Sequence, residues 1–157
     1  MFHRFRYEAE FYPSLSRVPL HVRMKLDLTG IRISLKDWLA FDFAERAALC
    51  HLPCRRLDER QAFVEYLDFL SRKYCGTPVV VTNALDSTLL DKSRLPEPVR
   101  KKSADSLKRI TSEEWSNWQF HERYALYKTA ISQSQPEAFA HVLEQLRDPS
   151  AAMETKL

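Results

Sequence analysis

Three cysteines and a histidine are the residues whose types and spacing could support metal or redox chemistry. Cys50, His51 and Cys54 fall in CHLPC, and Cys75 follows further along the chain. Zinc sites are typically built from paired C-x₂₋₄-C knuckles, and this chain lacks a second pair. Free cysteine is also among the residue types most often buried. We therefore expect structural thiols, and keep a small metal- or redox-responsive carrier as the alternative function.

Two glutamate–arginine pairs are the candidates for acid–base chemistry. Glu45-Arg46 and Glu122-Arg123 both occur in the context ERxAL. Neighbouring helical residues point about 100° apart, so neither pair forms a site alone. The duplication favours a structural role, in which the glutamate stabilises a helix start and the arginine bonds to the preceding helix or to the other copy. HERYA, which begins at His121, lacks the second histidine of a HExxH protease site. We expect no catalytic residues and no enzyme activity.

The composition excludes several functions. Only Gly30 and Gly76 are glycines, whereas phosphate-binding loops and dinucleotide fingerprints need several glycines close together, so we expect no such cofactor. The net charge is +3 with Lys and Arg scattered among acids, which argues against nucleic acid as a partner. No run approaches the roughly 18 apolar residues of a membrane span, and the charged first residues do not resemble a signal peptide. The odd number of cysteines favours reduced thiols and a cytoplasmic protein.

One stretch of the sequence occurs twice. Residues 18–49 align with 95–126 without a gap, and twelve of the 32 positions are identical. With a one-residue shift, QAFVEYLDFL at 61–70 corresponds to EAFAHVLEQL at 137–146. A match of this length at one offset predicts two copies of one helical unit. The identical pairs are Pro19/Pro96, Val22/Val99, Arg23/Arg100, Lys25/Lys102, Arg32/Arg109, Ile33/Ile110, Trp38/Trp115, Phe43/Phe120, Glu45/Glu122, Arg46/Arg123, Ala48/Ala125 and Leu49/Leu126.

Local signals predict the first two helices of each copy. A helix after the shared proline can end in the first copy at Gly30 with a left-handed cap, whereas Leu107 at the aligned position requires a different ending. Ser34 and Thr111 are N-cap residues with an acid three positions later, which is the pattern of a capping box. A short helix that carries the tryptophan should follow each cap.

Two further helices are predicted in each copy. Asp42 is a second N-cap in the first copy, where it starts a helix that must end before Pro53. Gln119 holds the aligned position in the second copy and caps less well. Apolar residues at helical spacing then predict amphipathic helices over 63–70 and 139–146.

The resulting fold class is all-α, with two tandem helical repeats packed into one domain. We expect a single domain over 1–149, with repeats at about 18–75 and 95–147, and a flexible tail over 150–157. The linker 76–94 breaks the helical pattern, and its run PVVVT predicts a short strand that could pair with FRYEAEF at 5–11.

Aromatic and arginine residues of the repeated segment are candidates for partner contacts. The tryptophans belong first of all to the core, but aromatic and arginine residues that escape it are typical interface anchors. The first helix of each copy is modestly basic and could meet an acidic protein surface. The candidate partner-binding residues are Arg23, Lys25, Trp38, Arg46, Arg100, Lys102, Trp115 and Arg123.

The chain resembles the conserved nitrate reductase-associated proteins of bacteria over nearly its whole length. The resemblance rests on FRYEAEF, on VPLHVRMKLDLTGIRISLKDWLAF, on LPC at 52–54, and on GTP at 76–78. It continues through LPEPV at 95–99, Trp115 and RYALYK at 123–128.

This resemblance implies an accessory role in nitrate assimilation. Such proteins are encoded near genes for assimilatory nitrate reductase and molybdenum-cofactor synthesis, and are thought to support that enzyme without catalysing a reaction. The implied partner is nitrate reductase or a protein that inserts its molybdenum cofactor. The resemblance supplies no catalytic, cofactor-binding or metal-binding residues.

Overall fold

The computed structural model describes residues 2–104 and 109–148, and within them the fold is helical with one two-stranded sheet. This confirms the predicted all-α class. The chain divides into two compact units. The first unit runs to Arg4 and from Glu8 to Leu85, and the second comprises Phe5–Tyr7 and the chain from Asp86 onward. The organisation into one domain of two repeats stays a prediction, and the tail predicted at 150–157 lies outside the described residues.

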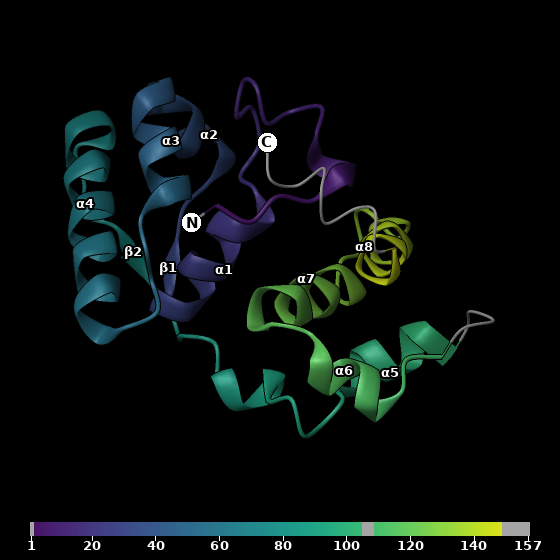
Figure 1. Cartoon of the computed structure of the whole chain (residues 1–157). Coiled ribbons are helices and arrows are strands. Elements are labelled where there is room, and N and C mark those ends of the chain that lie inside the picture. The colour runs from purple at the N-terminus through teal and green to yellow at the C-terminus, as the bar shows by residue number, and fades with distance from the viewer. Residues whose placement is uncertain (1, 105–108, 149–157) are drawn as a thin grey trace. The chain divides into compact units, whose positions relative to one another are not determined.

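The first unit contains four α-helices and both strands within its described residues (Figure 1). Helix α4 packs against α1 and α2, and α3 packs against α1. The buried core of this unit includes Trp38, Phe41, Leu49 and Phe63. The elements are α1 (Leu20–Thr29), β1 (Ile31–Arg32), α2 (Leu35–Ala40), α3 (Phe43–His51), α4 (Leu57–Cys75) and β2 (Val80–Val81).

In the second unit, α7 packs against both α5 and α8 (Figure 1). Its core includes Val99, Trp115, Leu126 and Phe139, all of which are buried. The elements are the 3-10 turns η1 (Arg6–Glu8, whose last residue belongs to the first unit) and η2 (Ser87–Leu90), and the helices α5 (Glu97–Ala104), α6 (Ser112–Asn117), α7 (Phe120–Ala130) and α8 (Ala138–Arg147).

The capping signals place the helix starts as predicted. Ser34 Oγ accepts a hydrogen bond from the Asp37 backbone N–H at 3.0 Å, and the Asp37 carboxylate accepts one from the Ser34 N–H at 3.3 Å. Asp42 and Glu45 form the same reciprocal box. Gln119 caps less completely: its backbone N–H donates to the Glu122 carboxylate at 2.8 Å, but its side chain makes no cap hydrogen bond.

Gly30 ends α1 as expected, with φ of 72° and its N–H directed back to the carbonyls of the last turn. The glycine is required for a second reason, because an added Cβ would lie 2.6 Å from the Thr82 carbonyl oxygen. The backbone of the linker therefore passes directly against this turn. The different ending predicted at Leu107 lies outside the described residues.

The predicted strand of the linker forms, but its predicted partner was wrong. Val80–Val81 pairs antiparallel with Ile31–Arg32, just after Gly30, and not with residues 5–11. The Thr82 N–H and hydroxyl both donate to the Gly30 carbonyl oxygen, which fixes the register. The alternation of FRYEAEF gives a 3-10 turn at Arg6–Glu8 instead, because Glu8 turns inward.

Candidate partner-binding surface

Trp38 and Arg46 secure the loop that precedes α1 in the first unit. Trp38 is fully buried, and its indole Nε1 donates to the Leu15 carbonyl oxygen at 2.7 Å. The Arg46 guanidinium donates to the Phe41 carbonyl oxygen at 2.7 Å and to the Ser14 carbonyl oxygen at 3.3 Å. The two side chains thus bind two consecutive carbonyls of one loop, and the arginine also closes the end of α2.

Trp115 and Arg123 make the corresponding contacts in the second unit. The Trp115 Nε1 donates to the Asp91 carbonyl oxygen at 3.0 Å, and the Arg123 Nε donates to the Leu90 carbonyl oxygen at 2.8 Å. A second Arg123 nitrogen donates to the Trp118 carbonyl oxygen at the end of α6. The predicted bond from the arginine to the preceding helix is present in both units. These contacts assign a structural function to the duplicated tryptophan and arginine.

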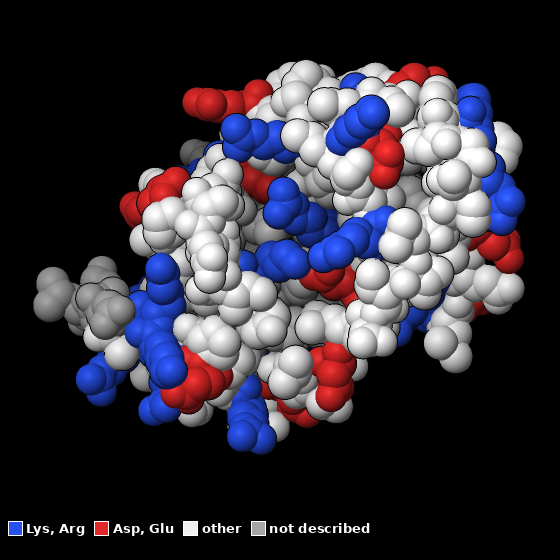
Figure 2. All heavy atoms as spheres, turned by 180° about the vertical axis from the view of Figure 1, so that it is seen from behind, with Lys and Arg blue, Asp and Glu red and all other residues white. Residues whose placement is uncertain are grey.

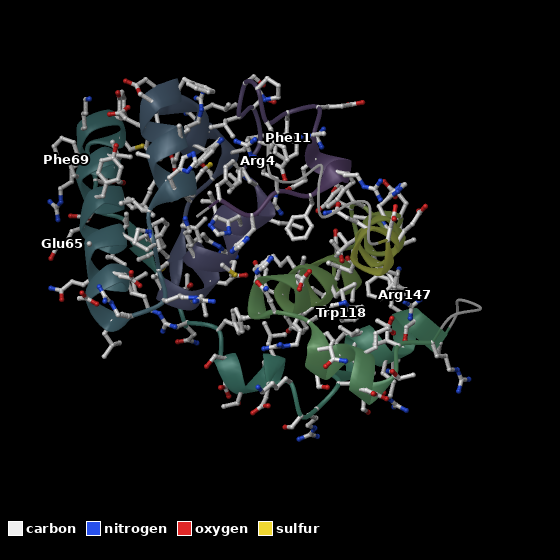
Figure 3. All side chains as sticks on the ribbon, viewed as in Figure 1. Arg4, Phe11, Glu65, Phe69, Trp118 and Arg147 are labelled. Atoms are coloured by element: carbon white, nitrogen blue, oxygen red, sulfur yellow. The ribbon has the colours of Figure 1, made fainter. Side chains whose placement is uncertain are left out.

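The end of the last helix in each unit is tied to the acid three residues after the N-cap of the tryptophan helix, which is Asp37 in α2 and Glu114 in α6. In the first unit, the Cys75 thiol donates to Asp37 at 3.3 Å. In the second, Arg147 on α8 (labelled in Figure 3) forms a two-pronged ion pair with Glu114, with distances of 2.7 and 2.8 Å. Burial raises the pKa of Asp37, but the hydrogen bonds from Cys75 and Ser34 outweigh it, so the pKa lies below its ordinary value.

Four of the eight candidate partner-binding residues lie inside the units. Trp38, Trp115 and Arg123 are buried, as described above. Lys25 is 1 % exposed, and its ammonium donates to the Leu49 and Cys50 carbonyl oxygens at 2.9 Å each. It closes the C-terminal end of α3, where a positive charge is favourable. These four residues are at most 8 % exposed, which leaves little surface for a partner to contact in the folded units.

The other four candidates reach the surface to different extents. Arg23 and Arg100 are exposed, and Arg100 pairs with Glu97 on its own helix. Arg46 and Lys102 are half-buried. On the face seen in Figure 2, basic and acidic side chains are interspersed. The basic first helices therefore remain candidate contacts only through their exposed members.

The three cysteines lie in environments that do not favour reactive thiols. Among residues 2–104 and 109–148, no group of three or more His, Cys, Asp or Glu side chains is placed to hold a metal ion. Cys50 and Cys54 are buried. Burial raises the pKa of the Cys50 thiol to about 12 and also raises that of Cys54 and Cys75. A thiol must lose its proton to attack a disulfide or bind a metal, so these environments do not favour the carrier function.

The first unit exposes three apolar side chains on the consecutive helices α2 and α3, which we call the docking patch: Leu35, Leu39 and Phe43. Their exposed fractions are 51 %, 47 % and 50 %. Leu35 and Leu39 are one turn apart on the same face of α2. Phe43 begins α3 four residues later, a span of at most about 14 Å. Single exposed apolar residues are common, whereas grouped ones are typical of protein contacts.

The second copy of the repeated segment shows that the helix does not need these leucines. Helix α2 reads LKDWLA and α6 reads SEEWSN, so Ser112 and Ser116 stand at the positions of Leu35 and Leu39. Both helices bury their tryptophan and have the same length. The local fold therefore does not require leucine at these two exposed positions. Sequence reasoning missed the docking patch, although a comparison of exposed positions between the two copies could have found it.

The first unit exposes further apolar residues, among them the adjacent Val80 and Val81 of β2, which are 59 % and 72 % exposed. Phe69 is 57 % exposed and lies one turn after Glu65 on α4, where both are labelled in Figure 3. Leu57, at the start of α4, is 83 % exposed. Leu57 and Phe69 are separated by three turns of one helix, so they form no joint surface.

A buried carboxylate at the N-terminal end of α1 was also missed. Glu8 is 3 % exposed, and its oxygens accept hydrogen bonds from the Tyr12 hydroxyl at 2.8 Å and from the Leu20 backbone N–H at 3.1 Å. Pro19 precedes Leu20 and provides no side-chain cap, so Glu8 supplies the cap from a distant part of the sequence. Burial raises its pKa to about 7, although both hydrogen bonds and the charge of Arg23 act in the opposite direction.

This raised pKa predicts a pH-dependent stability. The folded state holds the Glu8 proton more tightly than the unfolded chain, so that contribution is present below about pH 4.5 and is lost as the pH rises through about 7. Relative to Glu8→Gln, the wild type should lose up to about 3 kcal/mol of unfolding free energy between about pH 4.5 and pH 8. Urea unfolding of both proteins across this range measures the difference. Parallel pH profiles would show that Glu8 does not titrate there.

These features define a small helical protein whose repeated tryptophan and arginine are used internally and whose candidate site is an apolar surface. The chain belongs to the family of conserved nitrate reductase-associated proteins, whose family model matches residues 4–146. No curated protein and no solved structure matches the chain. Within the described residues, no helix combines the length and the apolar character needed to cross a membrane.

Proposed function

We propose that the protein is a non-catalytic, cytoplasmic accessory protein that supports the activity or maturation of assimilatory nitrate reductase by binding to it. The family association supplies the client, and the exposed docking patch is the observation that supports binding as the mode of action. A protein that inserts the molybdenum cofactor would be an equivalent client in the same role.

Leu35 and Leu39 are the central contacts in this proposal. They are about half exposed, whereas the aligned positions of the other copy are serines. Apolar side chains at the centre of an interface contribute by removing their surface from water, at about 25 cal/mol per Å². Phe43 extends the surface onto α3 and adds an aromatic side chain, a residue type enriched in interfaces.

Binding supports the client only if it distinguishes between states of the client. An accessory protein shifts an equilibrium by the difference between its affinities for two states, and not by its affinity alone. The docking patch must therefore bind the active or cofactor-loaded form of nitrate reductase more tightly than the other form. Helix α2, which carries the two leucines, is held by the bond from Trp38 to the Leu15 carbonyl oxygen and by its Ser34 cap.

The variant Leu35→Ser/Leu39→Ser tests the docking patch directly. Each change introduces the residue that α6 carries at the aligned position, so α2 should fold normally. We expect its affinity for purified nitrate reductase to fall at least about tenfold, because the loss of two central apolar contacts costs more than about 1.4 kcal/mol. Titration calorimetry or a surface-binding assay measures the dissociation constant.

Leu57→Ser is the matched control for this experiment. Leu57 is more exposed than either leucine of the docking patch but lies at the start of α4. Its replacement should leave the affinity unchanged. An affinity that falls equally in Leu57→Ser, or that survives in Leu35→Ser/Leu39→Ser, would remove the docking patch from the interface.

A further inference from the structure

The charged groups beside the docking patch differ in whether they are already bonded. Lys36 follows Leu35 on α2, is exposed, and has no hydrogen bond or ion pair within the described residues. The Arg46 guanidinium donates only to neutral carbonyl oxygens. Within the described residues, neither cation forms an ion pair with a carboxylate, although the charge of Lys36 helps to lower the pKa of its neighbour Asp37.

The neighbouring carboxylates Asp37, Asp42 and Glu45 all accept hydrogen bonds within the unit. Glu45 accepts from the Tyr74 hydroxyl at 2.6 Å, from the Asp42 N–H at 2.9 Å and from the Lys73 ammonium at 3.0 Å. Burial raises the pKa of Glu45, but these hydrogen bonds outweigh it and lower the pKa to about 2. Asp37 accepts from Ser34 and from the Cys75 thiol. A partner's cation would have to compete with these donors.

The aligned helix of the second copy has the opposite surface character. The position of Lys36 is occupied by Glu113, next to the serines that replace the two leucines. Helix α2 therefore exposes apolar and basic residues where α6 exposes polar and acidic ones. A lysine is not needed at this position for the helix to form, as the glutamate in α6 shows.

We infer that the docking patch binds an apolar surface of the client protein that is bordered by carboxylates, with Lys36 facing an acidic residue of that client. This inference rests on the proposed function, and it identifies the chemistry of the partner at the same site. The apolar contacts supply most of the affinity, and the charge contact at the rim accelerates association and selects the orientation.

Association kinetics with purified nitrate reductase holoenzyme test this inference. Lys36→Glu should slow association about fivefold or more at about 0.05 M salt, and the difference from wild type should shrink at about 0.5 M salt. Lys36→Gln should give a smaller decrease, and it guards against a folding defect caused by the added negative charge beside Asp37. Lys92→Glu, an exposed lysine of the second unit, is the matched control and should associate like wild type.

The outcomes separate this inference from the proposed function. If wild type binds and Leu35→Ser/Leu39→Ser does not, but Lys36→Glu and Lys36→Gln associate at the wild-type rate, then the partner surface is not acidic and only this inference is overturned. An equal slowing by Lys92→Glu would also overturn it, because the effect would then reflect net charge. Failure of the wild-type chain to bind nitrate reductase would overturn both.

Discussion

Replacement of Trp38 by alanine is expected to lower the free energy of unfolding by about 3–5 kcal/mol, the range for removing a large buried aromatic side chain. Trp38 is fully buried in the core of the first unit, so the change leaves a cavity. It also removes the hydrogen bond that the Trp38 indole donates to the Leu15 carbonyl oxygen. Urea unfolding followed by circular dichroism measures the loss.

Trp38→Phe separates the two contributions. The phenyl ring fills much of the volume but cannot donate to Leu15, so its cost should be clearly smaller than that of alanine, with about 1–3 kcal/mol attributable to the unpaired buried carbonyl. A free energy of unfolding for Trp38→Ala within about 1 kcal/mol of the wild-type value would show that the tryptophan is not the centre of the core. An interface role for Trp38 would then be the alternative.

Replacement of Arg123 by alanine is expected to cost more stability than the same change at Arg46. Arg123 is 8 % exposed and donates to the carbonyl oxygens of the buried Leu90 and the half-buried Trp118. Its removal leaves both oxygens without this donor, and we expect a loss of about 2–4 kcal/mol of unfolding free energy. Arg46 is half-buried, and water can replace part of its bonding, so we expect about 1 kcal/mol there. Equilibrium unfolding of both variants measures the order.

Arg100→Ala is the control for these two variants. Its guanidinium pairs with Glu97 at the surface, and an exposed ion pair of this kind contributes within about 0.5 kcal/mol. A cost at Arg123 no larger than that at Arg100 would contradict the structural function assigned to the duplicated arginine. Equal losses of unfolding free energy at Arg46 and Arg123 would show that the burial of the arginine does not determine its contribution to stability.

The helices were predictable because their signals are local. Ser34 with Asp37, and Asp42 with Glu45, define helix starts within four residues, and Gly30 and Pro53 limit helix ends. The hydrogen bonds involved join residues that are neighbours in the chain. No knowledge of the tertiary arrangement is needed to place them.

The features that sequence reasoning missed depend on distant pairs. The strand at 80–81 finds its partner at 31–32 because Gly30 allows the linker backbone to approach, which alternation in FRYEAEF could not reveal. Glu8 and Lys25 looked like surface charges, but each is buried at a helix end that it caps from elsewhere in the chain. A charged residue at such a position is compatible with burial because the backbone supplies its partners.

The partner-binding surface stays a prediction, and the structure changes which residues are candidates for it. The tryptophan segment was expected to contact a partner, and the docking patch does lie on the tryptophan helix of the first copy. Composition favoured aromatic and arginine residues as interface anchors. Trp38 and Arg123 are instead buried and donate hydrogen bonds to carbonyl oxygens of their own units. Helical spacing cannot tell which side of a six-residue helix faces the core when both sides carry apolar residues.

Nitrate reductase activity in a strain that lacks this gene tests the central claim most directly. The strain is complemented with the wild type, with Leu35→Ser/Leu39→Ser or with Leu57→Ser, and is grown on nitrate or on ammonium. We predict that the wild type and Leu57→Ser restore growth on nitrate and enzyme activity in extracts, that the double variant accumulates as folded protein but restores neither, and that growth on ammonium is unaffected. Full activity without the gene, or full rescue by the double variant, would contradict the account.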